Sequence, residues 1–531
     1  LKVMTFEQIR KKYKFIIIDE CHARSIELDI VMSLLKKLVN DNISEAPFCI
    51  FMSATFNVDK YATYFNTKTI FKVSGKSYQK IENYLEVSSS NYIQGVLDIV
   101  KKVHNTEEIE QGDINDILIF VSGAGAMNKL IKGLNDLNQS FDNPIIPIPL
   151  NSQIFKSGDN NYVNLFTKLH NLKVDKNGKS YKPSRRVIVS TNIAETGVTI
   201  ESLKYCIDTG FVTAIEFNPN FNCSILLNKP VTQSMAIQRK GRIGRVRPGI
   251  YYGMFTKSTY DDLIVDTIPA IMTEESILTI LNIIVKVTIE TIEDYKDKDL
   301  SKLGKFDLSL LDLMDPISID SMNNSIQKLY ILGMIHKNMY PTQIGIISVK
   351  FRKLSVENIK MILSGYHHKV NILDLITIAI FLTIGKQKIV IKGFESFVLK
   401  RCEIMRHKLL ISCEFIDFVI FFNYFIKIVI KNKSDISYIK RWCNEHFVLY
   451  ETMLNLIQFR DDIIKEMLFS LGLNPFIKYH SNLYKLMYEY DDRHPHLDII
   501  EIKQLKKCIY EGYKLNIAKL VDNEYYTMNT H

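Results

Sequence analysis

The length, composition and charge of the chain exclude several classes of protein. With 531 residues the chain is too long for a single hydrophobic core, and it predicts three or four domains. Apolar residues make up 47% of the sequence, which excludes an intrinsically disordered protein. The net charge of +9 is mildly basic and favours a polyanionic partner, although many ordinary enzymes carry a similar charge.

The cysteines and the longest apolar stretches bear on the compartment and on membranes. The eight cysteines form no CxxC pair and no zinc-ligand spacing, so we interpret them as buried thiols in a reducing compartment. The apolar stretches Leu375–Ile384 and Phe418–Ile426 are bounded by charged residues and fall short of the ~20 residues that a membrane helix needs. Both are predicted as core helices, and no membrane partner is expected.

A short apolar run near the start of the chain ends in acidic residues. Phe15–Ile18 predicts a buried parallel strand of an α/β sheet, and Asp19, Glu20, Cys21 and His22 follow it. The carboxyl end of such a strand is where open α/β sheets bind ligands, and carboxylates there suit Mg²⁺ and water. The alternative is an ordinary acidic cap at the start of a helix.

Two later apolar runs are followed by hydroxyl and amide side chains in the same way. Cys49–Met52 leads into Ser53, Ala54 and Thr55. Arg186–Val189 leads into the segment from Ser190 to Ile200. These runs repeat the pattern of strand followed by polar residues and are typical of a parallel sheet with helices on both faces.

The segment from Gln238 to Arg245 sets a glutamine and three arginines between glycines. Arg242 and Arg245 are three positions apart, so a helical turn would point both guanidinium groups the same way. Such fixed planar donors suit the oxygens of a transferring phosphoryl group. A solvated basic face, or a patch that touches nucleic-acid backbone, would use the same residues.

The four polar segments resemble, in this order, motifs of the DEAH-box branch of the superfamily 2 helicases. Motif II is matched by Asp19–His22, motif III by Ser53–Thr55, motif V by Ser190–Ile200 and motif VI by Gln238–Arg245. The resemblance extends to motif Ib at 1–5, motif IV at 117–123, the strand and β-hairpin near 205–227, and weaker matches to about residue 465.

This resemblance implies an α/β fold with tandem RecA-like domains, followed by winged-helix and helical ratchet domains. The expected domains are the C-terminal half of the first RecA-like domain at 1–75, the second at 76–256, a winged helix at 257–340, a helical bundle at 341–465, and a tail at 466–531 that is helical or a degenerate oligonucleotide-binding barrel. An exposed excursion is expected at 173–179, which has a turn composition.

The resemblance also implies roles for individual residues in the hydrolysis of ATP with Mg²⁺. The catalytic and nucleotide-binding residues would be Asp19 and Glu20, which hold the metal, together with His22, Gly197, Gln238, Arg242 and Arg245. Ser53 and Thr55 would couple hydrolysis to movement, and Thr5, Ser122, Gly123, Thr191 and Asn192 would contact nucleic acid. The implied activity is unwinding of RNA from 3′ to 5′, with a DNA translocase as the alternative.

The chain departs from the family pattern at several positions. Cys21 stands for the usual alanine, Ala23 for a glutamate, Gly197 for a serine and Thr209 for a proline. The missing hydroxyl at Gly197 puts in doubt a hydrogen bond that couples nucleotide state to RNA. The form of motif VI resembles viral members more than spliceosomal ones, which implies a protein of a large cytoplasmic DNA virus, located in host cytoplasm or virion. A monomer and an association with viral transcription machinery are also expected.

The phosphate loop GxxxxGK[ST] that a helicase of this kind needs is missing from the sequence. Gly75-Lys76-Ser77 and Gly178-Lys179-Ser180 imitate its end, but both lack the first glycine and follow motif II instead of preceding it. We therefore expect the chain to be the C-terminal part of a longer protein. The alternative is a nucleic-acid-binding module without ATPase activity.

Overall fold

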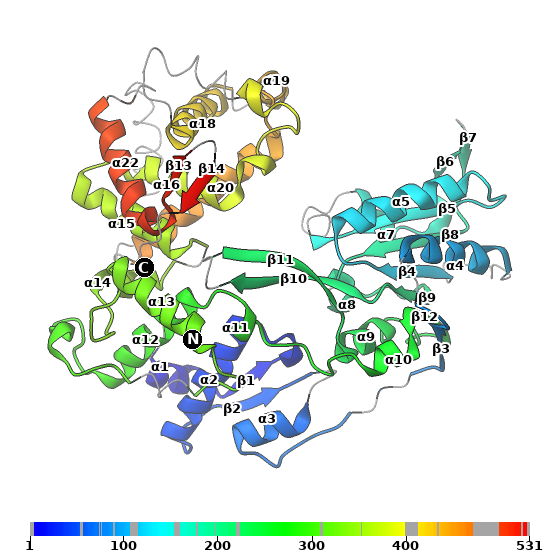
Figure 1. The fold of residues 1–531 in the computed structure, drawn as a ribbon, viewed down its shortest axis with the longest axis horizontal. Helices are drawn as coiled ribbons and strands as arrows, with labels where there is room; N and C mark the ends of the chain where they lie inside the picture. The colour runs from blue at the N-terminus through cyan, green and yellow to red at the C-terminus, as the bar shows by residue number, and fades with distance from the viewer. Residues whose placement is uncertain are drawn as a thin grey trace. The chain divides into compact units, whose positions relative to one another are not determined.

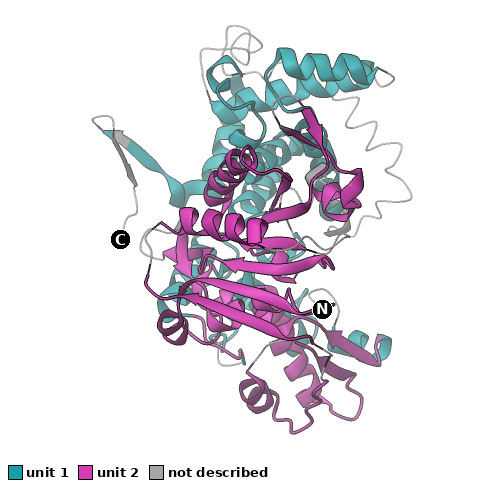
Figure 2. Cartoon of the chain, turned by 90° about the vertical axis from the view of Figure 1, so that its right-hand side faces the viewer, with its two compact units in different colours: residues 1–12, 276–312, 318–531 teal, residues 13–275, 313–317 magenta. Residues whose placement is uncertain are grey.

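A computed structural model of the chain divides it into two compact units (Figure 2). The sheet unit contains residues 13–275 and 313–317, and the helical unit contains residues 1–12, 276–312 and 318–531. Each unit is described by itself. The structure describes residues 5–53, 57–73, 75, 77–88, 91–106, 115–152, 160–176, 179–196, 198–218, 223–307, 312–351, 353–398, 413–432, 435–470, 497, 499–521 and 524–527.

A six-stranded parallel sheet forms the centre of the sheet unit (Figure 1). In spatial order its strands are β3 (Lys80–Leu85), β12 (Gly249–Thr256), β9 (Leu203–Asp208), β4 (Asp116–Phe120), β8 (Arg185–Ser190) and β5 (Ile145–Leu150). All five neighbouring pairs are parallel. The predicted α/β sheet of the RecA-like kind is therefore confirmed for this part of the chain.

Alternating apolar residues build one core on each face of this sheet. On β4, Ile117 and Ile119 pack with α4 (Tyr92–Thr106) and α5 (Ala124–Asn138). Leu118 and Phe120 point to the other face, where the second core includes residues of α7 (Asn160–Phe166), α8 (Ile193–Thr196) and the segment before β12. Because helices cover both faces of the sheet, the middle residues of the central strands are apolar, as in Ile117–Phe120 of β4 and Val187–Val189 of β8.

Two antiparallel hairpins project from the parallel sheet. Strands β10 (Phe211–Asn218) and β11 (Cys223–Pro230) pair along their whole length, which confirms the hairpin predicted near 205–227. The short hairpin of β6 (Val174–Lys176) and β7 (Lys179–Tyr181) occupies the predicted excursion.

A separate pair of parallel strands carries the acidic motif. Strand β1 (Phe15–Ile18) pairs with β2 (Phe48–Phe51), and α2 (Ile26–Asp41) and α3 (Val58–Phe65) follow them. The prediction of a strand buried on both faces is wrong, because the side chains of Phe15 and Ile17 are 66% and 58% exposed. Within the described residues this sheet has only two strands, and only the face of Ile18 and Phe51 joins a core cluster.

The helical unit is built around long apolar helices. Its longer helices are α12 (Ile277–Thr291), α13 (Ile319–Ile331), α15 (Val356–His368), α16 (Ile372–Ile384), α18 (Glu414–Lys431), α19 (Ile436–Glu445), α20 (Tyr450–Ser470) and α22 (Ile499–Tyr513). The predicted core helices at 375–384 and 418–426 are confirmed as α16 and α18. No helix in the described part of the chain is long and apolar enough to cross a membrane.

Shorter elements complete this unit. Helix α1 (Phe6–Lys12) joins α12 through a hydrogen bond from the Phe6 amide to Glu290 Oε1 of 3.1 Å. Helix α14 is Gln343–Ser348, and the last described elements are β13 (Ala518–Val521) and β14 (Glu524–Thr527), which form a hairpin. The domain boundaries predicted from the sequence stay predictions.

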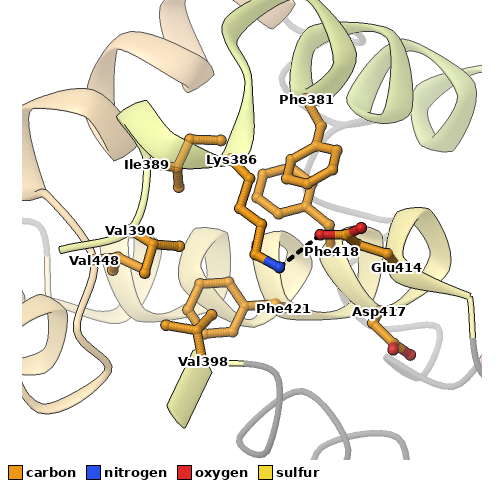
Figure 3. A pocket seen from close by; sticks show the side chains of 10 residues that line it. All are labelled: Phe381, Lys386, Ile389, Val390, Val398, Glu414, Asp417, Phe418, Phe421 and Val448. Atoms are coloured by element: carbon orange, nitrogen blue, oxygen red, sulfur yellow. Dashed lines mark ion pairs between the residues drawn. The ribbon is translucent and has the colours of Figure 1, made fainter. Parts of the chain in front are cut away.

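A pocket in the helical unit lies between α16 and α18 (Figure 3). Phe381, Phe418 and Phe421 form much of its lining, and Lys386 pairs with Glu414 at 2.8 Å beside them. Three charged residues, Lys386, Glu414 and Asp417, also line the pocket, but the rest of the lining is apolar, so we interpret the pocket as a gap in core packing.

Six of the cysteines are seen as free thiols. Cys21, Cys206, Cys443 and Cys508 are buried, as predicted. Cys49 and Cys413 are only partly buried, so the prediction of buried thiols is wrong for these two.

Candidate nucleotide and nucleic-acid site

The chain leaves β1 through a tight turn that displays two carboxylates. The Glu20 amide donates to Asp19 Oδ1 at 2.8 Å, and Glu20 has a left-handed backbone with φ of 54°. The next residue, Cys21, is buried and its amide donates to the Met52 carbonyl at the end of β2 at 3.0 Å. This anchoring leaves the side chains of Asp19 and Glu20 exposed at the carboxyl end of β1.

His22 connects this turn to the end of β2. Its Nδ1 atom lies 2.8 Å from Ser53 Oγ and 3.4 Å from Glu20 Oε2. The structure therefore brings Ser53, a predicted coupling residue, into direct contact with motif II. Thr55, the second predicted coupling residue, lies outside the described residues.

Four predicted nucleic-acid contacts gather at one edge of the large sheet. Ser122 and Gly123 follow β4, and Thr191 and Asn192 follow β8, the parallel neighbour of β4. The Thr191 amide donates to the Leu150 carbonyl at the end of β5 at 3.2 Å. A Cβ atom on Gly123 would lie 3.3 Å from Thr213 Oγ1, so hairpin β10–β11 reaches the same edge.

Thr5 is the fifth predicted nucleic-acid contact, and Gly197 is a predicted nucleotide-binding residue. Thr5 belongs to the helical unit, where its Oγ1 accepts from the Gln8 amide at 3.2 Å and its amide donates to Gln8 Oε1 at 3.0 Å. This reciprocal pair is a capping box that stabilises the start of α1. Gly197 lies outside the described residues.

Motif VI begins in a helix and ends in a turn. Gln238 lies in the last turn of α9 (Gln233–Lys240), which Gly241 caps. The expectation that one helical turn carries both Arg242 and Arg245 is wrong, because Gly244 has a φ of 72° and the chain turns back there. The Gly244 carbonyl accepts from the Tyr78 amide at 2.9 Å, which holds this turn against the residues before β3.

Arg242 and Arg245 remain close enough to repel each other. Burial and the charge of Arg245 lower the pKa of Arg242 to about 10, while Glu20 and Glu195 oppose this shift. Arg242 donates one long hydrogen bond of 3.4 Å to the Val198 carbonyl, and its buried Nε has no acceptor among the described residues. An anion placed here would relieve both the repulsion and the missing hydrogen bond.

The third arginine of motif VI has a different environment, which the sequence reading missed. Arg239 is fully buried, and it binds Glu195 at 2.7 Å and Asp208 at 2.6 Å. Burial opposes its charge, but the two carboxylates raise its pKa above the usual value. Arg239 thus joins α9 to motif V and to the end of β9. The sequence offers one indication of this arrangement, because each of those segments contains an acidic residue that could pair with a buried arginine.

We expect Arg239→Gln to destabilise the sheet unit strongly, because it leaves Glu195 and Asp208 buried without their cation. Removing one partner of a buried pair costs about 3–5 kcal/mol. Hydrogen exchange of β8 and β9 amides in increasing urea measures this loss within the sheet unit. The control is Arg245→Gln, an exposed site where the change should be within about 0.5 kcal/mol. Equal effects of both variants would contradict the prediction.

Comparisons with known proteins agree with this arrangement. Residues 151–247 match the family model of the helicase conserved C-terminal domain. The fold resembles two crystal structures of Escherichia coli HrpB, described as a DEAH/RHA helicase and as a DExH-box NTPase. The TM-scores are 0.54 and 0.56, with 19% and 18% identity, and the matches cover 72% and 73% of this chain and 44% of each HrpB chain. The chain is therefore similar to helicases, by the family model over residues 151–247 and in fold to HrpB.

More similar relatives come from a large DNA virus. The chain is 30% identical over 560 aligned positions to the African swine fever virus protein named "Putative RNA Helicase B962L", in a tick isolate from South Africa and in a warthog isolate from Namibia. Each match covers 97% of this chain and 56% of the viral protein. The chain therefore spans little more than half the length of these relatives.

Proposed function

We propose that this chain is the motor part of an ATP-dependent RNA helicase that unwinds from 3′ to 5′. The proposal depends on Arg242, whose buried Nε atom has no hydrogen-bond acceptor among the described residues. Burial and the charge of Arg245 disfavour the charged form of Arg242, whereas Glu20 of motif II favours it. A nucleotide phosphate is the anion that fits a site between acidic and arginine motifs. Names of the viral relatives and the HrpB structures support helicase and NTPase chemistry.

The residues at the end of β1 fit the Mg²⁺ that such chemistry uses. Mg²⁺ in phosphoryl-transfer sites is bound through one or two carboxylates, waters and substrate phosphates. Asp19 and Glu20 supply two exposed carboxylates, and the described residues hold no cluster of three or more metal-binding side chains that would form a closed cage. When bound, the metal neutralises charge on the phosphates. We assign Glu20 to orient or deprotonate the attacking water.

Motif VI supplies the positive side of the proposed site. Arg242 and Arg245 would stabilise the charge of the transferring phosphoryl group, and Gln238 would help to orient it. Gly197 would lie beside the nucleotide. His22 and Ser53 would transmit the state of the site from motif II to motif III, together with Thr55.

The nucleic-acid strand would cross the carboxyl edge of the large sheet. Ser122, Gly123, Thr191 and Asn192 would contact its phosphates, which positions a strand without reading its sequence. Thr5 would add a contact through motif Ib, and hairpin β10–β11 would separate the duplex. RNA is favoured over DNA because the viral relatives are named RNA helicases. We further propose a monomer that serves viral transcription in host cytoplasm or virion.

We expect the printed chain alone to hydrolyse no ATP, because it lacks the backbone amides and the lysine of a phosphate loop. By full-length protein we mean a protein that contains this chain together with a phosphate loop. The test measures phosphate release from ATP with and without RNA. The full-length protein should release phosphate faster with RNA, and the 531-residue chain at equal concentration should release none. Turnover by the printed chain would contradict the expectation, and a full-length protein that no nucleic acid stimulates would contradict the proposed function.

A further inference from the structure

A short segment between two parts of the helical unit belongs to the sheet unit. Residues 313–317 lie in the sheet unit, whereas 276–312 and 318–531 lie in the helical unit. Within this segment Met314 packs with the core cluster of Cys21, Met32 and Tyr61. Its neighbour Asp315 is only 14% exposed at the side chain. The chain thus enters the lobe of motif II for a few residues and leaves it again.

Asp315 binds two cations that follow different motifs. Its carboxylate accepts from Arg24 Nη2 at 2.5 Å, and Arg24 follows motif II. It also accepts twice from Lys60 Nζ, at 2.6 and 2.7 Å, and Lys60 lies at the start of α3, beyond motif III. Burial raises the pKa of Asp315, but Lys60 and Arg24 outweigh it and hold that pKa below its usual value. One carboxylate therefore joins the chain after motif II to the chain after motif III.

Arg24 is itself part of the turn that displays Asp19 and Glu20. Its guanidinium is buried and also binds both carboxylate oxygens of Asp29, at 2.6 and 3.0 Å. Its backbone is left-handed, with φ of 44°, and its carbonyl accepts from the Ala270 amide at 3.0 Å. A left-handed non-glycine residue is held in place only by its surroundings. The ion pairs of Arg24 are such surroundings.

We propose that Asp315 is a positioning residue for the acidic motif. By binding Arg24 and Lys60 together, it holds the turn that carries Asp19 and Glu20 in one geometry relative to the end of β2. The proposal rests on the proposed function only in its consequence for turnover. The geometric part concerns the printed chain alone. Arg24 and Asp315 are 291 positions apart, so the clamp couples motif II to a segment flanked on both sides by the helical unit.

Hydrogen exchange of the printed chain tests the geometric part. In Asp315→Asn, which keeps the shape but removes the charge, the Cys21 and Ala23 amides should exchange about tenfold faster. Asp315→Glu should recover much of the protection, because it restores the charge. Asp261→Asn is the matched control, since it removes the charge of an exposed carboxylate of the sheet unit that pairs with Lys257. It should leave both amides unchanged.

Two outcomes of this experiment would overturn the proposal. In the first outcome, the amides of 313–317 exchange faster while those of Cys21 and Ala23 exchange at the wild-type rate. Asp315 would then stabilise only its own segment. The other outcome is equal effects of Asp315→Asn and Asp261→Asn. Protection of the α2 amides reports whether a variant is folded around the acidic motif, because Met32 of α2 packs in the same core cluster as Met314. If Asp315→Asn loses that protection, Lys60→Met supplies the test, because it removes one cation and should shift the same two amides.

Turnover of the full-length protein tests the consequence. Misplacing a catalytic group by about 1 Å costs on the order of 10²-fold in rate, so kcat of Asp315→Asn should fall roughly 10- to 100-fold. The KM for ATP should stay within about twofold, because the substrate contacts remain. A higher KM for ATP together with an unchanged kcat would contradict the positioning role. If the wild-type protein shows no turnover, the proposed function is contradicted. The hydrogen-exchange experiment would still test whether Asp315 holds the acidic motif in place.

Discussion

Full-length protein with Glu20→Gln should bind ATP normally and lose its turnover. The side chain keeps its shape but can no longer accept the proton of the attacking water. General-base catalysis contributes roughly 10²- to 10⁴-fold, so RNA-stimulated phosphate release should fall by at least that range. Fluorescent-nucleotide binding and phosphate release, measured on the same preparation, separate the two effects.

Glu27→Gln is the control for this experiment. Glu27 is an exposed carboxylate in the first turn of α2, the helix that follows the motif II turn, and it has no assigned role in the site. It should retain wild-type turnover. Near wild-type turnover of Glu20→Gln itself would move the base to another residue, and weakened ATP binding in that variant would assign Glu20 to substrate binding.

The parts of the site that follow strand ends could be predicted from the sequence. Apolar runs such as Phe15–Ile18 and Arg186–Val189 end in polar residues, and parallel strands place their carboxyl ends at one edge. From this rule one can predict that Thr191 and Ser122, which follow neighbouring parallel strands, lie at the same edge of the sheet. The hairpin of β10 and β11 is likewise local, since its two strands are adjacent in sequence.

The parts that depend on burial and on distant contacts could not be predicted in this way. Arg239 and Arg245 look alike in a basic run, yet one is fully buried between two carboxylates and the other is exposed. The partner of Arg24 lies 291 positions away, and no periodicity links Asp315 to motif II. Exposure of Phe15 also escapes a local rule, because it depends on what covers the sheet.

The turn of motif VI shows how a local rule fails. Spacing of three positions predicts two guanidinium groups on one helical face, but α9 ends at Lys240 and Gly244 reverses the chain. The two arginines stay within electrostatic reach through the turn instead of through a helix. That they act together in catalysis stays a prediction.

Arg242→Ala in the full-length protein should cut kcat by on the order of 10³, the lower range for an arginine that stabilises a transferring phosphoryl group. Arg245→Ala should act in the same direction, because each arginine lies in the field of the other. RNA affinity and its salt dependence should barely change. Lys257→Ala, which removes an exposed cation of the sheet unit, is the control and should keep wild-type kcat.

The rival reading, in which both arginines bind phosphodiester, makes the opposite prediction. Losing one backbone contact to a single strand should reduce the slope of log K against log salt by ~0.7 and leave RNA-saturated kcat nearly unchanged. The structure favours the first outcome on electrostatic grounds. Arg242 is half-buried, has an Nε without an acceptor among the described residues, and is stabilised by Glu20. A backbone contact that slides along RNA needs an exposed, hydrated cation, whereas a phosphate enclosed between lobes can replace the lost hydration of Arg242. A salt-slope change with normal turnover would assign motif VI to RNA.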